Sequence, residues 1–165
     1  MSLPDLAAVL WRQRDLLERL VYRLECEQLL LAAGRTRFLA MATAEVETLL
    51  ADLRVLEMQR CRAADQVAGE AGLPSGVSLE ELAAAVQPPW TGVLVEHREA
   101  LLVLTRELAT LAETNRTLVA AGMKAVESTL AGLGAGSDAS AVGYDASGRS
   151  DVVQGSGPLV VDRAL

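Results

Sequence analysis

Leucine recurs at alternating steps of three and four residues through the N-terminal part of this chain. The positions in this row are Leu3, Leu6, Leu10, Gln13, Leu17, Leu20, Leu24, Glu27 and Leu31. Because an α-helix has about 3.6 residues per turn, this spacing places the whole row on one stripe of a helix. A second row, at Val9, Leu16 and Leu30, widens the stripe. A stripe of that width predicts contact with more than one other helix.

Two later stretches repeat the same spacing. The first contains Val46, Leu49, Leu53, Leu56, Arg60, Ala63 and Val67. The second and longer row contains Trp90, Leu94, His97, Leu101, Leu104, Leu108, Leu111, Asn115, Leu118, Gly122 and Ala125, and its apolar face then drifts to Val119, Met123, Val126, Leu130 and Leu133. We therefore predict an all-α fold: a long antiparallel hairpin, a short helix and a long last helix in a coiled-coil-like bundle.

Capping residues and helix breakers give the limits of these helices. The first helix is predicted to begin near Ser2 or Leu3, with Pro4 in its first turn, and to run to Ala33 before Gly34. Thr43 is the predicted N-cap of the second helix, which ends at the glycines of 69–76. Ser78 and Glu81 have capping-box spacing and begin a short helix to about Val86. Pro88 and Pro89 then separate it from the last helix, predicted to end near Leu133.

The composition excludes several classes of protein. Hydrophobic residues make up 51% of the chain but aromatic residues only 3%, which is typical of helix packing and not of a β-sandwich. The net charge of −7 disfavours binding to nucleic acid. The N-terminus lacks a basic signal-peptide region, and no apolar run is long enough to span a membrane. We therefore expect a cytoplasmic protein that does not insert into membranes, with Cys26 and Cys61 as free thiols.

Glycine and serine dominate the C-terminal part of the sequence. This change predicts two regions, a helical domain over 1–133 and a flexible tail over 134–165. Two islands interrupt the tail, at 144–148 around Tyr144 and at 159–161. Short islands of this kind are either recognition motifs or neutral sequence, and the pattern alone leaves both readings open.

The sequence offers little for catalysis, for a metal or for a cofactor. His97 is the only histidine, and Leu94 occupies the position where a di-metal Glu-x-x-His pair would need Glu. Cys26 and Cys61 lie on separate predicted helices without the spacing of a zinc site. The glycines of 132–136 close a helix, whereas a phosphate-binding loop opens one. We expect no enzyme activity and no cofactor.

Two of the polar residues within the apolar rows, Asn115 and Arg60, allow more than one interpretation. Asn115 either fixes helix register from a buried position or lies at an exposed edge of the bundle, and the sequence supports both readings. Arg60 is expected to pack its aliphatic stem on the hairpin while its guanidinium reaches water, although opening of the hairpin there is the alternative.

The order of these elements resembles that of the FlgN-type flagellar export chaperones. The motifs that carry the resemblance are the segment 10–18 (LWRQRDLLE), Asn115-Arg116-x-Leu118 and Tyr144-Asp145-x-x-Gly148, and they span roughly residues 3–149. The Gly/Ser linker before Tyr144 and the apolar segment 159–161 depart from the family pattern. The resemblance implies an all-helical chaperone for the flagellar hook-associated proteins at the hook–filament junction. It would bind their helical C-terminal segments, prevent premature assembly and deliver them to the type III export gate.

The resemblance and the apolar rows together suggest two contact sites. The expected client-binding residues lie where the apolar row continues past the length of the hairpin: Leu118, Val119, Met123, Val126, Leu130 and Leu133. The expected export-gate contacts are Tyr144, Asp145 and Gly148. We expect a monomer or weak homodimer. The alternative function is a structural coiled-coil scaffold that oligomerises through the same apolar row.

Overall fold

The computed structural model describes residues 2–137, 143–144 and 150–151. The elements in chain order are α1 (Leu3–Ala32), the 3-10 turn η1 (Thr36–Phe38), α2 (Leu39–Glu70), α3 (Leu79–Ala85), α4 (Trp90–Ser137), β1 (Gly143–Tyr144) and β2 (Ser150–Asp151). The prediction of an all-α bundle is confirmed. The chain divides into two compact units, one up to Leu118 and one from Val119 onward, and each is described separately.

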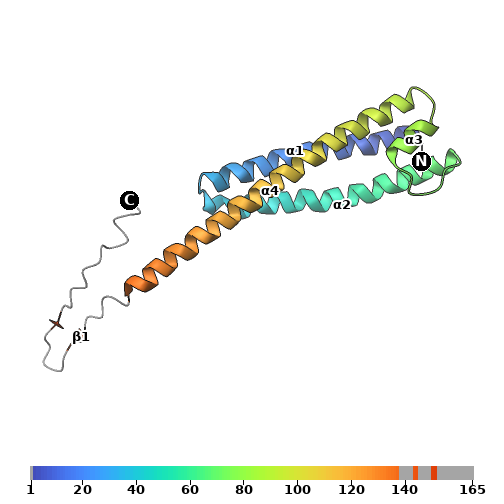
Figure 1. Cartoon of the computed structure of the whole chain (residues 1–165). Helices are drawn as coiled ribbons and strands as arrows, with labels where there is room; N and C mark the ends of the chain where they lie inside the picture. The colour runs from blue at the N-terminus through green and yellow to red at the C-terminus, as the bar shows by residue number, and fades with distance from the viewer. Residues whose placement is uncertain (1, 138–142, 145–149, 152–165) are drawn as a thin grey trace. The chain divides into compact units, whose positions relative to one another are not determined.

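The helices α1 and α2 form an antiparallel hairpin and lie side by side in Figure 1. The first helix begins at Leu3, where the backbone N–H of Ser2 donates to the Asp5 carboxylate at 2.8 Å. It ends at Ala32, and Gly34 follows with φ of 63°, a left-handed conformation that favours glycine. The predicted limits of this helix are confirmed to within one residue.

The start of α2 differs from the sequence prediction. The helix begins at Leu39, directly after η1, so Thr43 lies inside its first turns and is not an N-cap. The hydroxyl of Thr43 instead donates across the hairpin to the Glu27 carboxylate of α1 at 2.7 Å. An N-cap residue precedes the first turn of its helix, and Thr43 lies four residues after the start of α2, so the capping interpretation of Thr43 was wrong.

Ser78 begins α3 as predicted. Its hydroxyl accepts a hydrogen bond from the Glu81 backbone N–H at 3.1 Å, and the Ser78 backbone N–H donates to the Glu81 carboxylate at 2.7 Å. The last helix begins at Trp90 as predicted but ends at Ser137, four residues beyond Leu133. Glycine lowers helix stability by only about 1 kcal/mol per residue. The glycines after Leu133 are therefore too weak a signal to locate the end of a long helix.

The apolar core of the first unit consists of two clusters. The first joins α1, α2, α3 and α4 near the N-terminus: Leu6, Leu10, Ala63, Ala64, Val67, Ala68, Leu82, Ala83 and Leu94. The second lies along the hairpin, with Leu108 and Leu111 of α4 packed against it: Val9, Leu16, Leu20, Leu24, Val46, Leu49 and Leu56. In Figure 1, α3 accordingly lies beside the N-terminal end of α1. The core is aliphatic, in keeping with the low content of aromatic residues.

The second unit contains the C-terminal part of α4 and one short β-pair. The strands β1 and β2 are antiparallel, with Gly143 opposite Asp151 and Tyr144 opposite Ser150. The segments 138–142, 145–149 and 152–165 lie outside the described residues, and with them the predicted apolar island at 159–161.

Candidate functional site

Five large apolar side chains form an exposed row on the C-terminal part of α4, which we call the α4 stripe. Their exposed fractions range from 41% to 62%. The steps between them are four, three, four and three residues, which keeps them on one face of the helix. The members are Val119, Met123, Val126, Leu130 and Leu133. Leu118, predicted to belong to this row, is half-buried and belongs to the first unit.

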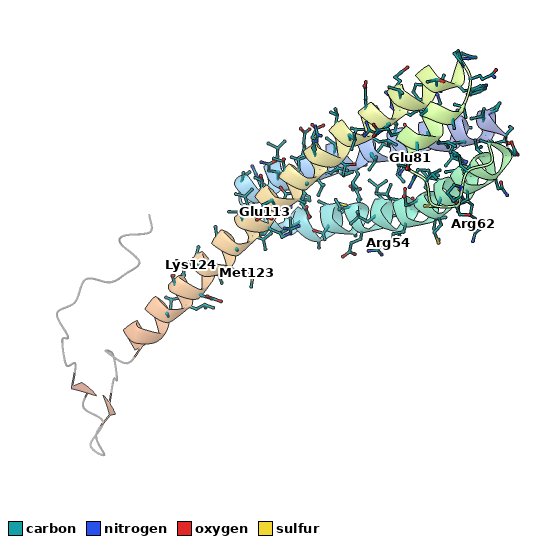
Figure 2. The ribbon with its side chains drawn as sticks, turned by 45° about the vertical axis from the view of Figure 1, so that its right-hand side comes forward. Arg54, Arg62, Glu81, Glu113, Met123 and Lys124 are labelled. Carbon is teal, nitrogen blue, oxygen red and sulfur yellow. The ribbon has the colours of Figure 1, made fainter. Side chains whose placement is uncertain are left out.

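The α4 stripe has narrow, nearly uncharged edges. Lys124 and Glu127 are the only charged residues between Val119 and Leu133, and Lys124 lies away from the stripe by helical spacing. Figure 2 labels Met123 and Lys124 on this part of the helix. The positions beside the stripe are otherwise small residues, including Gly122 and Thr129. Small edges allow the backbone of a second helix to approach closely, so the surface is suited to helix packing.

In the first unit, polar contacts fix α4 against the hairpin. Asn115 is buried, and its side-chain amide donates to the Leu24 carbonyl oxygen at 3.0 Å and to the Glu27 carboxylate at 3.1 Å. Glu27 also accepts from Thr43, so one carboxylate joins α1, α2 and α4. Of the two readings of Asn115, the structure supports the buried residue that fixes register.

A second polar group lies on the opposite half of the hairpin. The Gln13 amide is buried and donates to the Glu57 carboxylate at 2.7 Å, and Arg60 donates to the same carboxylate at 2.9 Å. The Arg60 guanidinium beside it is the main cause that lowers the pKa of Glu57. Arg60 therefore binds a carboxylate on its own helix, and the hairpin does not open there.

His97 is buried where α4 crosses α1. The ring of Trp11 meets it edge to face with centroids 4.9 Å apart, and the Arg14 guanidinium lies 4.7 Å from the Trp11 ring centroid. Burial lowers the pKa of His97, and the nearby Arg14 lowers it further, while Glu96 acts in the opposite direction. Glu96 is the acidic neighbour of this group, and it forms an ion pair with Arg14 at 3.5 Å. The group therefore has the character of a packing contact between α1 and α4.

The predicted export-gate residues are only partly described. Tyr144 lies in β1, where its backbone pairs with Ser150, whereas Asp145 and Gly148 lie outside the described residues. Within the described part of the chain, no three His, Cys, Asp or Glu side chains gather as a metal site would require. The same residues include no helix that is both long and apolar enough to cross a membrane.

A comparison with protein-family models decides the family. The model for the FlgN protein matches residues 1–151, which is most of the chain. The chain belongs to the FlgN family. FlgN proteins are flagellar export chaperones and not a family of enzymes. No curated protein and no solved structure gave a significant match.

Sequence reasoning on this FlgN-family chain missed the role of Glu27 and Gln13. Both stand in the apolar row of the first predicted helix, but the bonds they make to α2 and α4 were not predicted. The signal was present, since a polar residue at a core position requires a partner. The identity of the partner depends on the register between helices, which the sequence of one helix does not contain.

Proposed function

We propose that this chain binds helical C-terminal segments of flagellar hook-associated proteins through the α4 stripe. The binding would keep those segments unassembled until they are delivered to the flagellar type III export gate. Membership of the FlgN family supports the general chaperone role. The observation that carries the finer proposal is the exposed heptad row from Val119 to Leu133, on a segment of α4 that has only two charged residues.

The chemistry of the stripe favours a helical client. A subunit that polymerises through amphipathic terminal helices exposes an apolar face before assembly, and a matching apolar row covers it. Met123 at the second position has an unbranched, flexible side chain that adapts to different partners. Five side chains also make a modest interface, which suits a chaperone that must release its client at export.

The remaining parts of the proposal concern location, assembly and delivery. We propose a cytoplasmic protein that acts as a monomer or weak homodimer, without a cofactor and without catalysis. The proposed contact with the export gate is the segment of Tyr144, Asp145 and Gly148. An aromatic side chain within a glycine-rich sequence is a suitable anchor for short-motif recognition.

Light scattering after size exclusion tests client binding. The purified chain is run alone and with the C-terminal region of a hook-associated protein, and we expect a one-to-one complex. Leu130→Asp should abolish the complex by placing a charge in the stripe. The matched control is Val103→Asp, because Val103 is equally exposed on α4 but belongs to the first unit.

The alternative function, a coiled-coil scaffold, predicts a different result in the same experiment. A scaffold would form a stable oligomer through the α4 stripe and would ignore the client. An oligomer that Leu130→Asp dissociates, with no client complex in the parent chain, would refute the chaperone proposal.

The delivery step has its own test. Tyr144→Ala should leave the client complex intact and reduce export of the client by flagellated cells that lack the endogenous chaperone. Normal export with Tyr144→Ala would remove Tyr144 from the proposed gate contact without affecting the client site.

A further inference from the structure

A groove runs along the outer face of the α1–α2 hairpin. It consists of two adjoining pockets of about 330 and 450 Å³ that share Arg19 and Asp52. Among the described residues, only α1 and α2 line the two pockets. We call this surface the hairpin groove. It lies entirely within the first unit and shares no residue with the α4 stripe.

The floor and rim of the hairpin groove are apolar. Leu16, Leu49 and Leu56 form the buried floor. Val55 and Tyr22 at the rim are 51% and 58% exposed. Apolar side chains exposed beside an apolar floor gain from being covered, at roughly 25 cal/mol for each Å² removed from water.

The two walls of the groove carry opposite charge. The α1 wall has three arginines, Arg12, Arg19 and Arg23, against the single acid Asp15. The α2 wall has Glu45 and Asp52 and no basic residue. The groove is therefore basic along one side and acidic along the other.

The charged side chains of the walls are available to a partner. Arg23 and Glu45 form an ion pair of 2.9 Å, but their side chains are 41% and 44% exposed. Arg19 lies 4.0 Å from Asp15, and both are more exposed still. Exposed ion pairs of this kind contribute about 0–1 kcal/mol, so exchanging them for contacts with a partner costs little.

We propose that the hairpin groove is a docking site for one amphipathic helix of a partner protein. The helix carries an apolar stripe, an acidic edge that faces α1 and a basic edge that faces α2. The wall from Arg12 to Arg23 extends about 17 Å along α1, which matches about three turns of the docked helix. Opposite charges on the two walls select the partner and fix its direction in the groove.

A second copy of this chain fits the groove less well. The helix that a second copy would present is the α4 stripe. Its edges carry Glu127 and small residues, whereas the groove requires an acidic row on one edge and a basic row on the other. The inference does not depend on the proposed client site, because the two surfaces share no residue.

Synthetic helices provide the probe for this site. The first is a stapled peptide of about four turns with leucine on its stripe, glutamate on one edge and lysine on the other. Two control peptides carry glutamate on both edges or lysine on both edges. By fluorescence anisotropy with the full chain, we expect the mixed-edge peptide to bind about tenfold more tightly than either control, with an affinity that falls as salt is raised.

Charge substitutions on the α1 wall test whether the peptide binds in the hairpin groove. Arg19→Glu should weaken the mixed-edge peptide about tenfold, whereas Arg106→Glu, an exposed arginine of α4, should leave binding unchanged. The double variant Arg19→Glu with Arg23→Glu makes both walls acidic and should prefer the all-lysine peptide. Because this is a gain of binding, a variant that merely fails to fold cannot produce it.

Three results would overturn the inference. One is equal or absent binding of all three peptides, and another is an Arg106→Glu variant that loses binding as Arg19→Glu does. The third is a dimer of the chain, detected by sedimentation, that Arg19→Glu dissociates. That result would show that a second copy of the chain occupies the groove.

Discussion

The side-chain amide of Asn115 on α4 lies 3.0 Å from the carbonyl oxygen of Leu24 on α1, although 91 positions separate them in the sequence. The same amide donates to Glu27, which also accepts from Thr43 of α2. Leucine rows alone allow helices to slide by a turn at small cost. A polar contact shared by three helices favours one register, because a shift of α4 would leave the buried Asn115 amide N–H groups without the partners they have here.

Replacing Asn115 by aspartate should destabilise the bundle. The substitution keeps the shape but exchanges the donor for a second carboxylate against Glu27. We expect the free energy of unfolding in urea at pH 7 to fall by about 2–3 kcal/mol. Thr117→Ala is the control, since the Thr117 hydroxyl bonds only to the backbone of its own helix. Equal stability of Asn115→Asp and the parent would contradict a register role for Asn115.

The buried His97 should make stability depend on pH. Its pKa is lowered in the folded state, mainly by burial, so the unfolded chain binds the proton more readily. Stability is therefore complete above the ordinary histidine pKa of about 6.5 and is lost as pH falls below it and through the lower folded pKa. Denaturant midpoints followed by tryptophan fluorescence should fall between pH 7 and pH 5.

A variant without the imidazole isolates this effect. Since His97 is the only histidine in the chain, His97→Gln should flatten the pH dependence between pH 7 and 5.5. The carboxylates of Asp5, Glu57 and Glu81, whose pKa values are lowered by hydrogen bonds, titrate at more acidic pH. An unchanged slope in His97→Gln would show that another group is responsible.

Truncating Leu94 should test the junction of all four helices. Leu94 is fully buried in the cluster that joins α1, α2, α3 and α4. Leu94→Ala leaves a cavity there, and we expect a loss of about 2–5 kcal/mol in the free energy of unfolding. Val103→Ala removes a similar side chain from an exposed position of the same helix and should change stability by less than about 0.5 kcal/mol.

The cap at Ser78 should control the local stability of α3. Ser78→Ala removes the acceptor of the Glu81 backbone N–H. We expect this amide to exchange its hydrogen about fivefold faster in native-state hydrogen exchange, with little change in global unfolding. Ser78→Asp, which keeps an acceptor at the N-cap, should restore slow exchange. Equal exchange rates in the parent and Ser78→Ala would show that the cap contributes nothing.

The sequence predicted the helices better than the contacts between them. Apolar spacing located α1, α2 and α4, and the capping box at Ser78, which located α3, was confirmed in atomic detail. Thr43 was assigned wrongly because a Thr before acidic residues is typical of an N-cap, and its bond to Glu27 depends on the packing of two helices. The hairpin groove was also not predicted, since its opposite walls come from residues that are far apart in sequence and alternate with core positions.

The polar contacts also indicate an order of folding. Contacts between α1 and α2, such as Gln13 with Glu57, close loops of about 44 residues, whereas the contact of Asn115 with Leu24 closes a loop of 91. Longer loops carry a greater entropic cost and form more slowly. During synthesis, the hairpin can therefore close while α4 is still within or near the ribosome. Glu27 is then ready to receive Asn115, and the last helix aligns on a hairpin that has already formed.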